Sequence, residues 1–507
     1  MRMKRFFLKN LGFIWVLCCL NPFFTGAEEN DQAVLNLFKE ITAVPRCFTN
    51  ESNMGIWLQK WAQENGYQAE GDSTGNVVIR VPATRGYEQA PVIVLQSHMD
   101  MVCEKSSAST HDFFKDPIRL KQEGEWLQAD QTTLGADDGI GMALALAAAK
   151  DPMAPHPGLE LLFTVGEESG MVGADALSES FLRGRVLINL DSEKEGSITV
   201  GSAGSRTTGM AMPIKQEKLP ESYSIYALKV DGLQGGHSGV DINRKRGNAI
   251  KLLGKALEAV RKDAEIRLIE LKGGSRVNAI PRQAEALLAF DKDRLEKVQK
   301  TMKNLAKTLQ QELSLNDKGL TIGLTSFDGD RPANGFTVSD SSRIISLLAA
   351  LPDGVAKMDP RFQGMVETSN NLGVLQTNAD GLTLLSLQRS SSMAGLEELT
   401  SKIKEISSAA GASANDQNGH DPWQPNPDSN LLKRSKEVYY KLFGREPYVG
   451  TVHGGLECGV LAAKFRNMDI IAVGPSVQGV HAPGERVHIP SIGKVRKFLA
   501  ALLASFK

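Results

Sequence analysis

Short apolar segments that end in histidine or acidic residues recur along this chain, and they constrain its fold more than any other feature. Continuous apolar runs are typical of strands buried on both faces of a largely parallel sheet. The carboxyl ends of such strands meet at one edge of the sheet, where open α/β sheets bind ligands. The runs and the polar residues that follow them are 91–95 with His98, 159–165 with Glu167 and Glu168, 186–190 with Asp191, and 469–473 with His481.

The pattern of predicted elements divides the chain into two domains. Helices alternate with apolar runs up to about residue 204, whereas longer alternating strands and amphipathic helices follow from residue 206. The polar, turn-rich stretch 411–429 ends this second pattern, and the first pattern then returns. We therefore predict an α/β domain with a largely parallel central sheet, interrupted by an inserted α+β domain. The predicted bounds are 28–205 and 411–507 for the α/β domain, and 206–410 for the insert.

Composition excludes several classes of protein. The chain has 507 residues, of which 41% are hydrophobic and 23% charged, as in ordinary globular proteins with large cores. Its 58 basic and 59 acidic residues give a net charge of -1, so no overall field favours nucleic acid or an anionic membrane surface. A small-molecule partner, without nucleic acid, is the expectation.

The first 27 residues have the pattern of a signal peptide. A basic start precedes the apolar run 11–24, and the small residues Thr25, Gly26 and Ala27 follow it. We expect cleavage near Ala27 and export of the mature chain to the periplasm or the medium, with no stable membrane span afterwards. An uncleaved anchor is the alternative, but the run is shorter than the roughly 20 residues that a span needs.

The cysteines give no sign of a disulfide framework. Cys47, Cys103 and Cys458 remain in the mature chain, an odd number without CxxC spacing. We expect Cys103 and Cys458 to be small buried thiols rather than nucleophiles. Any metal site must then be built from histidine, aspartate and glutamate.

Two acidic motifs lie near the predicted strand ends. His98 and Asp100 are two residues apart and face the same side if the strand continues, so that Asp100 can orient the imidazole. Asp137 precedes a helix of small residues, where capping of the helix is the alternative role. Recurrence of such residues at several strand ends favours a common site over separate structural roles.

Several motifs in order carry a family resemblance. They are SHMDMVCEK, LGADDGIGMA, TVGEESGM, INLDSE, GGHSG, HGGLECG and VHAPGERVHI. With this set, the chain resembles the di-zinc aminoacyl-histidine dipeptidases, also called peptidase D, over essentially all of its mature length. The resemblance implies that the α/β domain is catalytic and that the insert is a lid.

The resemblance also implies the metal ligands and the base. His98, Asp137 and Asp191 would hold one zinc ion, and Asp137, Glu168 and His481 a second, with other divalent ions left open. Glu167 would be the general base for a metal-activated water. One departure is Asp138, where peptidase D relatives commonly have asparagine.

On the lid, the resemblance implies three further residues. His237 of GGHSG would stabilise the oxyanion, and Asn278 and Arg389 would hold the substrate. A turn histidine and a strand-end surface arginine are the alternatives for His237 and Arg389. Glu457 could hold the free amine of the substrate, although stabilisation of a helix start explains a glutamate equally well.

The sequence thus predicts zinc-dependent hydrolysis of small peptides, namely dipeptides of the Xaa-His type. The alternatives are another di-zinc amidohydrolase, either a deacylase or a tripeptidase, and a non-catalytic zinc-dependent binding protein. The last would normally lack Glu167 or a ligand. A homodimer is left open, as is whether the lid histidine serves its own or a partner's site.

Overall fold

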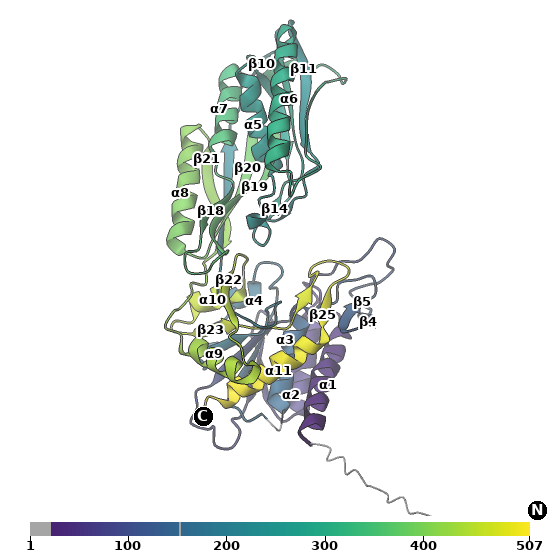
Figure 1. Cartoon of the computed structure of the whole chain (residues 1–507), viewed down its shortest axis with the longest axis vertical. Helices are drawn as coiled ribbons and strands as arrows, with labels where there is room; N and C mark the ends of the chain where they lie inside the picture. Colours follow the sequence, from purple (N-terminus) through teal and green to yellow (C-terminus); the bar gives the residue numbers. More distant parts are fainter. Residues whose placement is uncertain (1–21, 152–153) are drawn as a thin grey trace, which may run out of the picture.

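The computed structural model describes residues 22–151 and 154–507, which form an α/β domain and an elongated lid above it (Figure 1). Residues 1–21, with the basic start and most of the expected signal peptide, lie outside the described residues. The first helix, α1 (Pro22–Thr42), runs through the expected cleavage site after Ala27. Within the described residues, no helix is both long and apolar enough to cross a membrane.

The α/β domain is built on an eight-stranded mixed sheet. In spatial order its strands are β1 (Gln68–Gly71), β2 (Val77–Val81), β6 (Leu159–Thr164), β3 (Ile93–His98), β7 (Val186–Asn189), β23 (Asp469–Ala472), β8 (Ser197–Ser202) and β22 (Tyr448–Val452). The strands β6, β3, β7 and β23 are parallel to one another, whereas β1–β2, β2–β6 and β23–β8 pair antiparallel. Strand β22 also pairs parallel with β8. The α/β class is as predicted, and the sheet is mixed, with a parallel centre.

Helices cover both faces of this sheet. The larger core packs α1, α2 (Ser52–Glu64), α3 (Ala136–Lys150), α9 (Asn430–Phe443) and α11 (Ile489–Ala504) against one face. On the other face, α4 (Val172–Ala176) and α10 (Glu457–Lys464) contribute to a smaller core. Helix α3 is rich in alanine and glycine and almost wholly buried, because small side chains let it lie close to the sheet. This position brings the start of α3 to the carboxyl ends of the central strands.

A second, four-stranded sheet lies beside the start of α3. Its strands in spatial order are β24 (Val477–Gln478), β25 (Arg486–His488), β5 (Trp126–Ala129) and β4 (Leu120–Glu123). The connection between β24 and β25 carries His481, whose φ of 63° is in the left-handed region. This sheet therefore fixes both ends of the loop that holds His481.

The lid is a nine-stranded antiparallel sheet with helices packed on one face. Its strands are β16 (Thr321–Ser326), β11 (Tyr223–Asp231), β15 (Ala284–Asp291), β13 (Arg267–Gly273), β19 (Val366–Asn378), β20 (Gly381–Ser390), β9 (Gly204–Met212), β21 (Ser413–His420), and β18 (Gly354–Met358), which pairs with β19. The helices are α5 (Ala249–Arg261), α6 (Leu295–Glu312), α7 (Val338–Ala350) and α8 (Met393–Ala409). Two short pairs complete it: β10 (Gln216–Lys218) with β17 (Asn334–Phe336), and β12 (Gly236–His237) with β14 (Ala279–Ile280).

The lid sheet extends beyond the predicted boundary at residue 410. Strand β21, in the stretch expected to be turns, pairs with β9 from Ser413↔Ala211 to His420↔Ser205. It is an edge strand with mostly exposed side chains, so its polar sequence hid it. The two connections to the α/β domain consequently lie side by side, and the Ser202 amide donates a hydrogen bond to the Trp423 carbonyl at 3.0 Å.

Cys47 and Cys103 form a disulfide, which corrects the expectation that the chain has none. The two residues are 56 positions apart and come together because the segment after α1 runs beside the segment after β3, at the bridge Cys47↔Met101. Spacing along the chain gives no sign of such a pairing. Cys458 is a free, buried thiol, as predicted.

Candidate active site

Three groups of three metal-binding side chains meet at the carboxyl ends of β3, β6 and β7: one consists of His98, Glu167 and Glu168, and the two described next share Asp137. His98 Nε2 lies 3.0 Å from Asp137 Oδ1 and 3.9 Å from Asp191 Oδ1. His481 Nε2 lies 3.2 Å from Asp137 Oδ2 and 2.9 Å from Glu168 Oε1. Asp137 thus belongs to both groups, with one carboxylate oxygen facing each. In the following paragraphs the five residues of these two groups are called the acidic cluster.

The fully buried side chain of Asp100 positions residues of the acidic cluster. Its Oδ1 lies 3.3 Å from His98 Nδ1, so the other ring nitrogen, Nε2, is directed at Asp137. The two carboxylate oxygens also accept hydrogen bonds from the amides of Glu167 and Glu168, at 3.0 and 3.1 Å. One side chain therefore orients the imidazole and the segment that carries both glutamates.

Two buried supports of the cluster were not predicted from the sequence. Arg46 donates hydrogen bonds to the carbonyl oxygens of Met99, Asp100 and Gly135, which ties the loop after β3 to the start of α3. On the other side, Glu485 accepts hydrogen bonds from the backbone amides of residues 134–137, at 2.7 to 3.3 Å. Glu485 lies within the VHAPGERVHI motif, which was the available signal, whereas nothing in the sequence distinguishes Arg46.

The electrostatics of the cluster favour a multiply charged cation. Burial, together with the neighbouring carboxylates, raises the pKa of Glu167 and Asp191 well above the usual range. For His98, burial lowers the pKa, but the hydrogen bonds that its ring donates to Asp100 and Asp137 outweigh this effect, and the pKa is well above 6.5. Contacts with Asp137 and Glu168 raise the pKa of His481 to about 11. These groups share an excess of negative charge that protons or metal ions must offset.

Asp138 lies beneath the cluster. Its Oδ1 accepts a hydrogen bond from the Gly141 amide at 3.1 Å, and burial raises the pKa of its carboxyl to about 8. Burial thus favours the uncharged form of this side chain.

On the lid, His237 is the last residue of β12, and its tautomer follows from its contacts. Its Nδ1 accepts hydrogen bonds from the amides of Gly239 and Val240, both at 3.2 Å. Burial and the nearby Arg389 lower the pKa of His237 to about 4, so the ring is neutral at pH 7. The proton of a neutral ring must then be on Nε2, which is available as a donor.

The loop that follows His237 faces the site of its own chain. A Cβ atom built on Gly239 would lie 2.3 Å from the carbonyl oxygen of His453, so the loop packs directly on the α/β domain. A cleft of about 430 Å³ opens there, with Asp191 and Glu193 on the α/β side and Val240 on the lid side. The lining of this cleft includes Gly239 and Val240, the second and third residues after His237.

Arg389 and Asn278 lie beside the same loop. Arg389 is only 7% exposed, and its Nε lies 3.4 Å from Ser238 Oγ. Burial lowers its pKa to about 10, so the guanidinium remains charged, yet no described acidic side chain lies within ion-pair distance. Asn278 accepts a hydrogen bond from the Ser238 amide through its carbonyl oxygen at 2.9 Å, and its side chain is exposed. A buried cation without an acidic partner is suited to bind an anionic group.

Glu457 does not reach the cleft, which corrects its predicted contact with the substrate amine. It is 1% exposed, at the start of α10. Its carboxylate accepts hydrogen bonds from Gln96 Nε2 at 2.7 Å and Thr164 Oγ1 at 2.6 Å. The side chain thus points into the sheet beneath the cluster, where burial raises its pKa to about 7.

Residues 94–505 match the model of the peptidase family M20/M25/M40. The chain belongs to this family. It is 37% identical over 477 residues to the cytosol non-specific dipeptidase of Escherichia coli, covering 94% of this chain and 98% of the relative. The crystal structure of aminoacylhistidine dipeptidase from Vibrio alginolyticus superimposes with a TM-score of 0.84 at 35% identity, covering 93% of this chain and 96% of that one. Aminopeptidase PepT from Bacillus cereus, at 17% identity and a TM-score of 0.55 over 94% and 98% of the two chains, shares the fold.

These matches confirm the resemblance to the aminoacyl-histidine dipeptidases. The chain is a peptide hydrolase, and metal-dependent dipeptide hydrolysis is the activity that its membership of the M20/M25/M40 family supports. The expectation of export is contradicted, because the Escherichia coli relative is a cytosol dipeptidase. Basic and apolar residues at the start of a sequence were insufficient evidence for that location.

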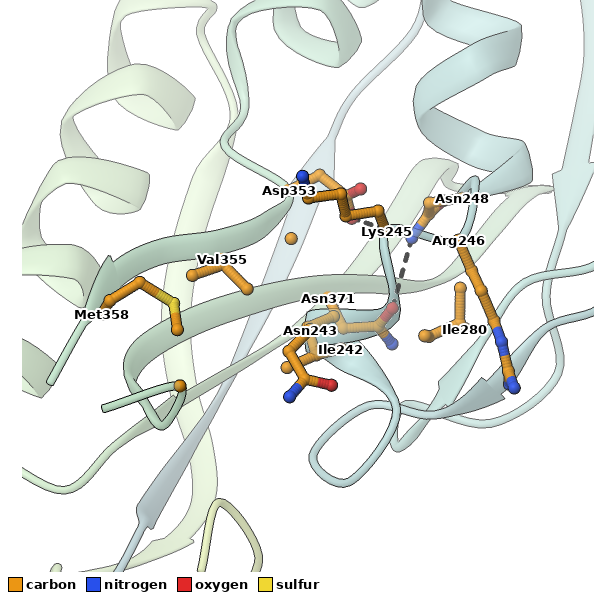
Figure 2. A pocket seen from close by; sticks show the side chains of 12 residues that line it. Ile242, Asn243, Lys245, Arg246, Asn248, Ile280, Asp353, Val355, Met358 and Asn371 are labelled. Carbon is orange, nitrogen blue, oxygen red and sulfur yellow. Dashed lines mark hydrogen bonds between the residues drawn. The ribbon is translucent and has the colours of Figure 1, made fainter. Parts of the chain in front are cut away.

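A second cavity, of about 540 Å³, lies within the lid of this M20/M25/M40 chain (Figure 2). Asn243 lines both this cavity and the cleft at the cluster. Asn248 donates hydrogen bonds to Asp353 at 2.9 Å and to Asn371 at 3.2 Å in its wall. Arg246 is already engaged by the Gly235 carbonyl oxygen and by Asp241. The described charged side chains of this cavity do not form a metal-binding group like those of the acidic cluster.

Proposed function

We propose that the chain hydrolyses dipeptides of the Xaa-His type with two zinc ions. The observation that carries this proposal is that Asp137 belongs to two of the three groups of ligands, so that one carboxylate can bridge two metal ions. Similarity to a Vibrio protein named for aminoacylhistidine substrates supports the preference for histidine. The Escherichia coli relative is a dipeptidase, which supports a substrate of two residues.

The donor atoms of the cluster fit zinc. His98, Asp137 and Asp191 would hold one ion, and Asp137, Glu168 and His481 the other; the ligand atoms of each group lie within 4.8 Å of one another. Imidazole nitrogen and carboxylate oxygen are zinc ligands, and three protein ligands per ion are typical of catalytic sites. When bound, the pair of ions would lower the pKa of a water and polarise the scissile carbonyl group.

Glu167 acts as the general base in this proposal. It follows β6 beside Glu168, and although it lies close enough to His98 and Glu168 to form a third metal-binding group with them, it is in neither of the two groups that share Asp137. Burial raises the pKa of its carboxyl well above the usual range, so the group holds a proton readily. Glu167 would take a proton from the attacking water and deliver it to the leaving amine.

The lid supplies the groups that stabilise negative charge. His237 donates its Nε2–H to the oxyanion that develops on the carbonyl oxygen, since its Nδ1 is already an acceptor. Arg389 binds the substrate carboxylate, with the exposed amide of Asn278 beside it. All three residues come from the lid, whereas the proposed ligands and base come from the α/β domain.

Metal removal and readdition, followed by a substrate panel, tests the proposal. Protein treated with a chelator should lose hydrolysis of alanyl-histidine and recover it when two equivalents of Zn²⁺ are added. The reconstituted protein should hydrolyse dipeptides faster than acetylated amino acids or tripeptides. Faster hydrolysis of an acetylated amino acid would identify a deacylase. Zinc binding without hydrolysis of any member would identify a binding protein.

A further inference from the structure

We propose that Glu193 binds the free α-ammonium group of the substrate and so limits the enzyme to peptides with an unblocked amino terminus. This inference rests on the proposed dipeptidase function and names the substrate class more closely. In this proposal the partner of the amine is Glu193 rather than Glu457, whose side chain points into the sheet.

The chemistry of a dipeptide limits where its ammonium group can bind. The α-nitrogen is two bonds from the scissile carbonyl carbon, so it must lie close to the acidic cluster when that carbonyl reacts. A cation taken out of water at this point needs an acidic partner. The partner must border the open cleft and must not already be engaged by other groups.

Other acidic side chains next to the cluster do not meet these conditions. None of those named below is more than 7% exposed. Three of them already accept hydrogen bonds. Asp100 accepts from the backbone amides just after β6, Glu485 from the backbone amides at the start of α3, and Glu457 from Gln96 and Thr164. The set consists of Glu51, Asp100, Asp138, Glu457 and Glu485.

Glu193 does meet the conditions. It lines the cleft together with Asp191, and its residue is exposed. Within the described part of the chain, its carboxylate forms no hydrogen bond or ion pair, and the adjacent Lys194 is directed at the ring of Tyr448, 5.5 Å away. Glu193 is two residues after Asp191 of the acidic cluster, and both residues border the same cleft.

The two sides of the site then carry opposite charges that match a zwitterion. Glu193 provides a carboxylate beside the cluster, and Arg389 provides a buried cation on the lid. An N-acylated amino acid has a carboxylate for Arg389 but no cation for Glu193. Closing the site over such a compound would leave the Glu193 carboxylate unpaired, which disfavours binding. Glu193 thus separates dipeptides from the substrates of a deacylase.

The test compares two substrates that differ only in the amino group. Alanyl-histidine has the ammonium, and propionyl-histidine has a hydrogen in its place. The wild-type protein should prefer alanyl-histidine in kcat/KM by on the order of 10- to 100-fold, as expected for a lost charge-assisted hydrogen bond. Glu193→Gln should remove most of this preference by lowering kcat/KM for alanyl-histidine, with propionyl-histidine changed by less than about 3-fold.

Two further variants and a metal assay make the result specific. Glu193→Asp keeps the charge and should retain a preference for alanyl-histidine. Glu70→Gln removes an exposed carboxylate that pairs with Arg80 on β2, far from the cleft, and should behave as wild type. Metal content measured on each variant should be unchanged.

The outcomes separate this inference from the proposed function. If wild-type protein hydrolyses alanyl-histidine and Glu193→Gln keeps its preference, the assignment of Glu193 is wrong and the dipeptidase function stands. An equal loss on both substrates, accompanied by loss of metal, also contradicts the assignment, because Glu193 would then act through the metal site. Wild-type protein that hydrolyses neither substrate contradicts the proposed function itself.

Discussion

The α/β side and the lid side of the cleft are built in different ways and carry opposite charge. On the α/β side, carboxylates lie at the ends of central strands and at the start of α3, and Asp100 and Glu485 fix the local backbone. On the lid side, a neutral histidine ends the short strand β12 and a buried arginine lies on β20. The α/β side is suited to hold cations and move protons. The lid side is suited to stabilise anionic groups of the substrate.

The two adjacent glutamates of the α/β side, Glu167 and Glu168, should differ most clearly in their effects on activity and metal binding. Glu167→Gln should lower kcat by about 10²- to 10⁴-fold, because it removes the proposed proton acceptor. Both metal ions should remain, since Glu167 is in neither group that contains Asp137. Steady-state kinetics beside metal analysis measures both effects.

Glu168→Gln is the matched variant for this comparison. It removes a carboxylate that lies 2.9 Å from His481, so it should weaken one metal site as well as activity. If Glu167→Gln loses a full equivalent of metal, or if Glu168→Gln keeps two equivalents and stays active, the two roles are assigned wrongly.

His237 tests whether the lid contributes to the chemistry or only covers the site. His237→Ala should lower kcat by on the order of 10²-fold, the usual effect of losing one oxyanion donor. The metal content should not change, because the residue belongs to none of the metal-binding groups. An unchanged kcat would indicate that the lid only covers the site and that His237 does not take part in the chemistry.

Arg389 should affect binding of the substrate more than turnover. Arg389→Met should raise KM for a dipeptide by about 10- to 100-fold through loss of a charge-assisted hydrogen bond. A dipeptide amide, which lacks the carboxylate, serves as the control substrate and should be hydrolysed about equally by both proteins. Equal losses on the two substrates would show that Arg389 supports the fold rather than the carboxylate.

The smallest expected effect is the contribution of His453, which contacts the lid, to the pH dependence of the free energy of unfolding. Burial and the nearby Arg389 lower the pKa of His453 to about 3, below its ordinary value of 6.5. Below about pH 6.5 the unfolded chain therefore binds a proton that the folded chain does not, and the free energy of unfolding falls as the pH falls toward 3. Between pH 7 and pH 5, the free energy of unfolding of His453→Gln should fall by about 1–2 kcal/mol less than that of the wild type. Urea unfolding at the two pH values measures this, and identical losses would contradict it.

The sequence was most informative where the position of a residue depends on its own strand. His98, Glu167, Glu168 and Asp191 each follow an apolar run, and the parallel centre of the sheet brings such ends together. His481 is less local, since two short strands of a second sheet hold its loop. The apolar run 469–473 pointed to it, and the motif order of a known family implied its role as a ligand.

Residues whose positions depend on distant contacts were missed. The disulfide needs two segments 56 residues apart to lie side by side, and Arg46 acts through carbonyl oxygens that any residue possesses. Glu457 was misplaced because its position in the motif does not determine which way the first residue of α10 points. The edge strand β21 was read as turns, since an exposed strand needs no apolar pattern.

The paired connections at Ser202 and Trp423 have a mechanical consequence. Both crossings between the domains lie at one edge of the lid and are joined to each other by a backbone hydrogen bond. The lid would move about this point as one unit, because α5–α8 and the nine-stranded sheet share one core. A rotation about this point would carry His237, Asn278 and Arg389 away from the strand ends together. Product could then leave while the spacing of the three residues stays ready for the next substrate.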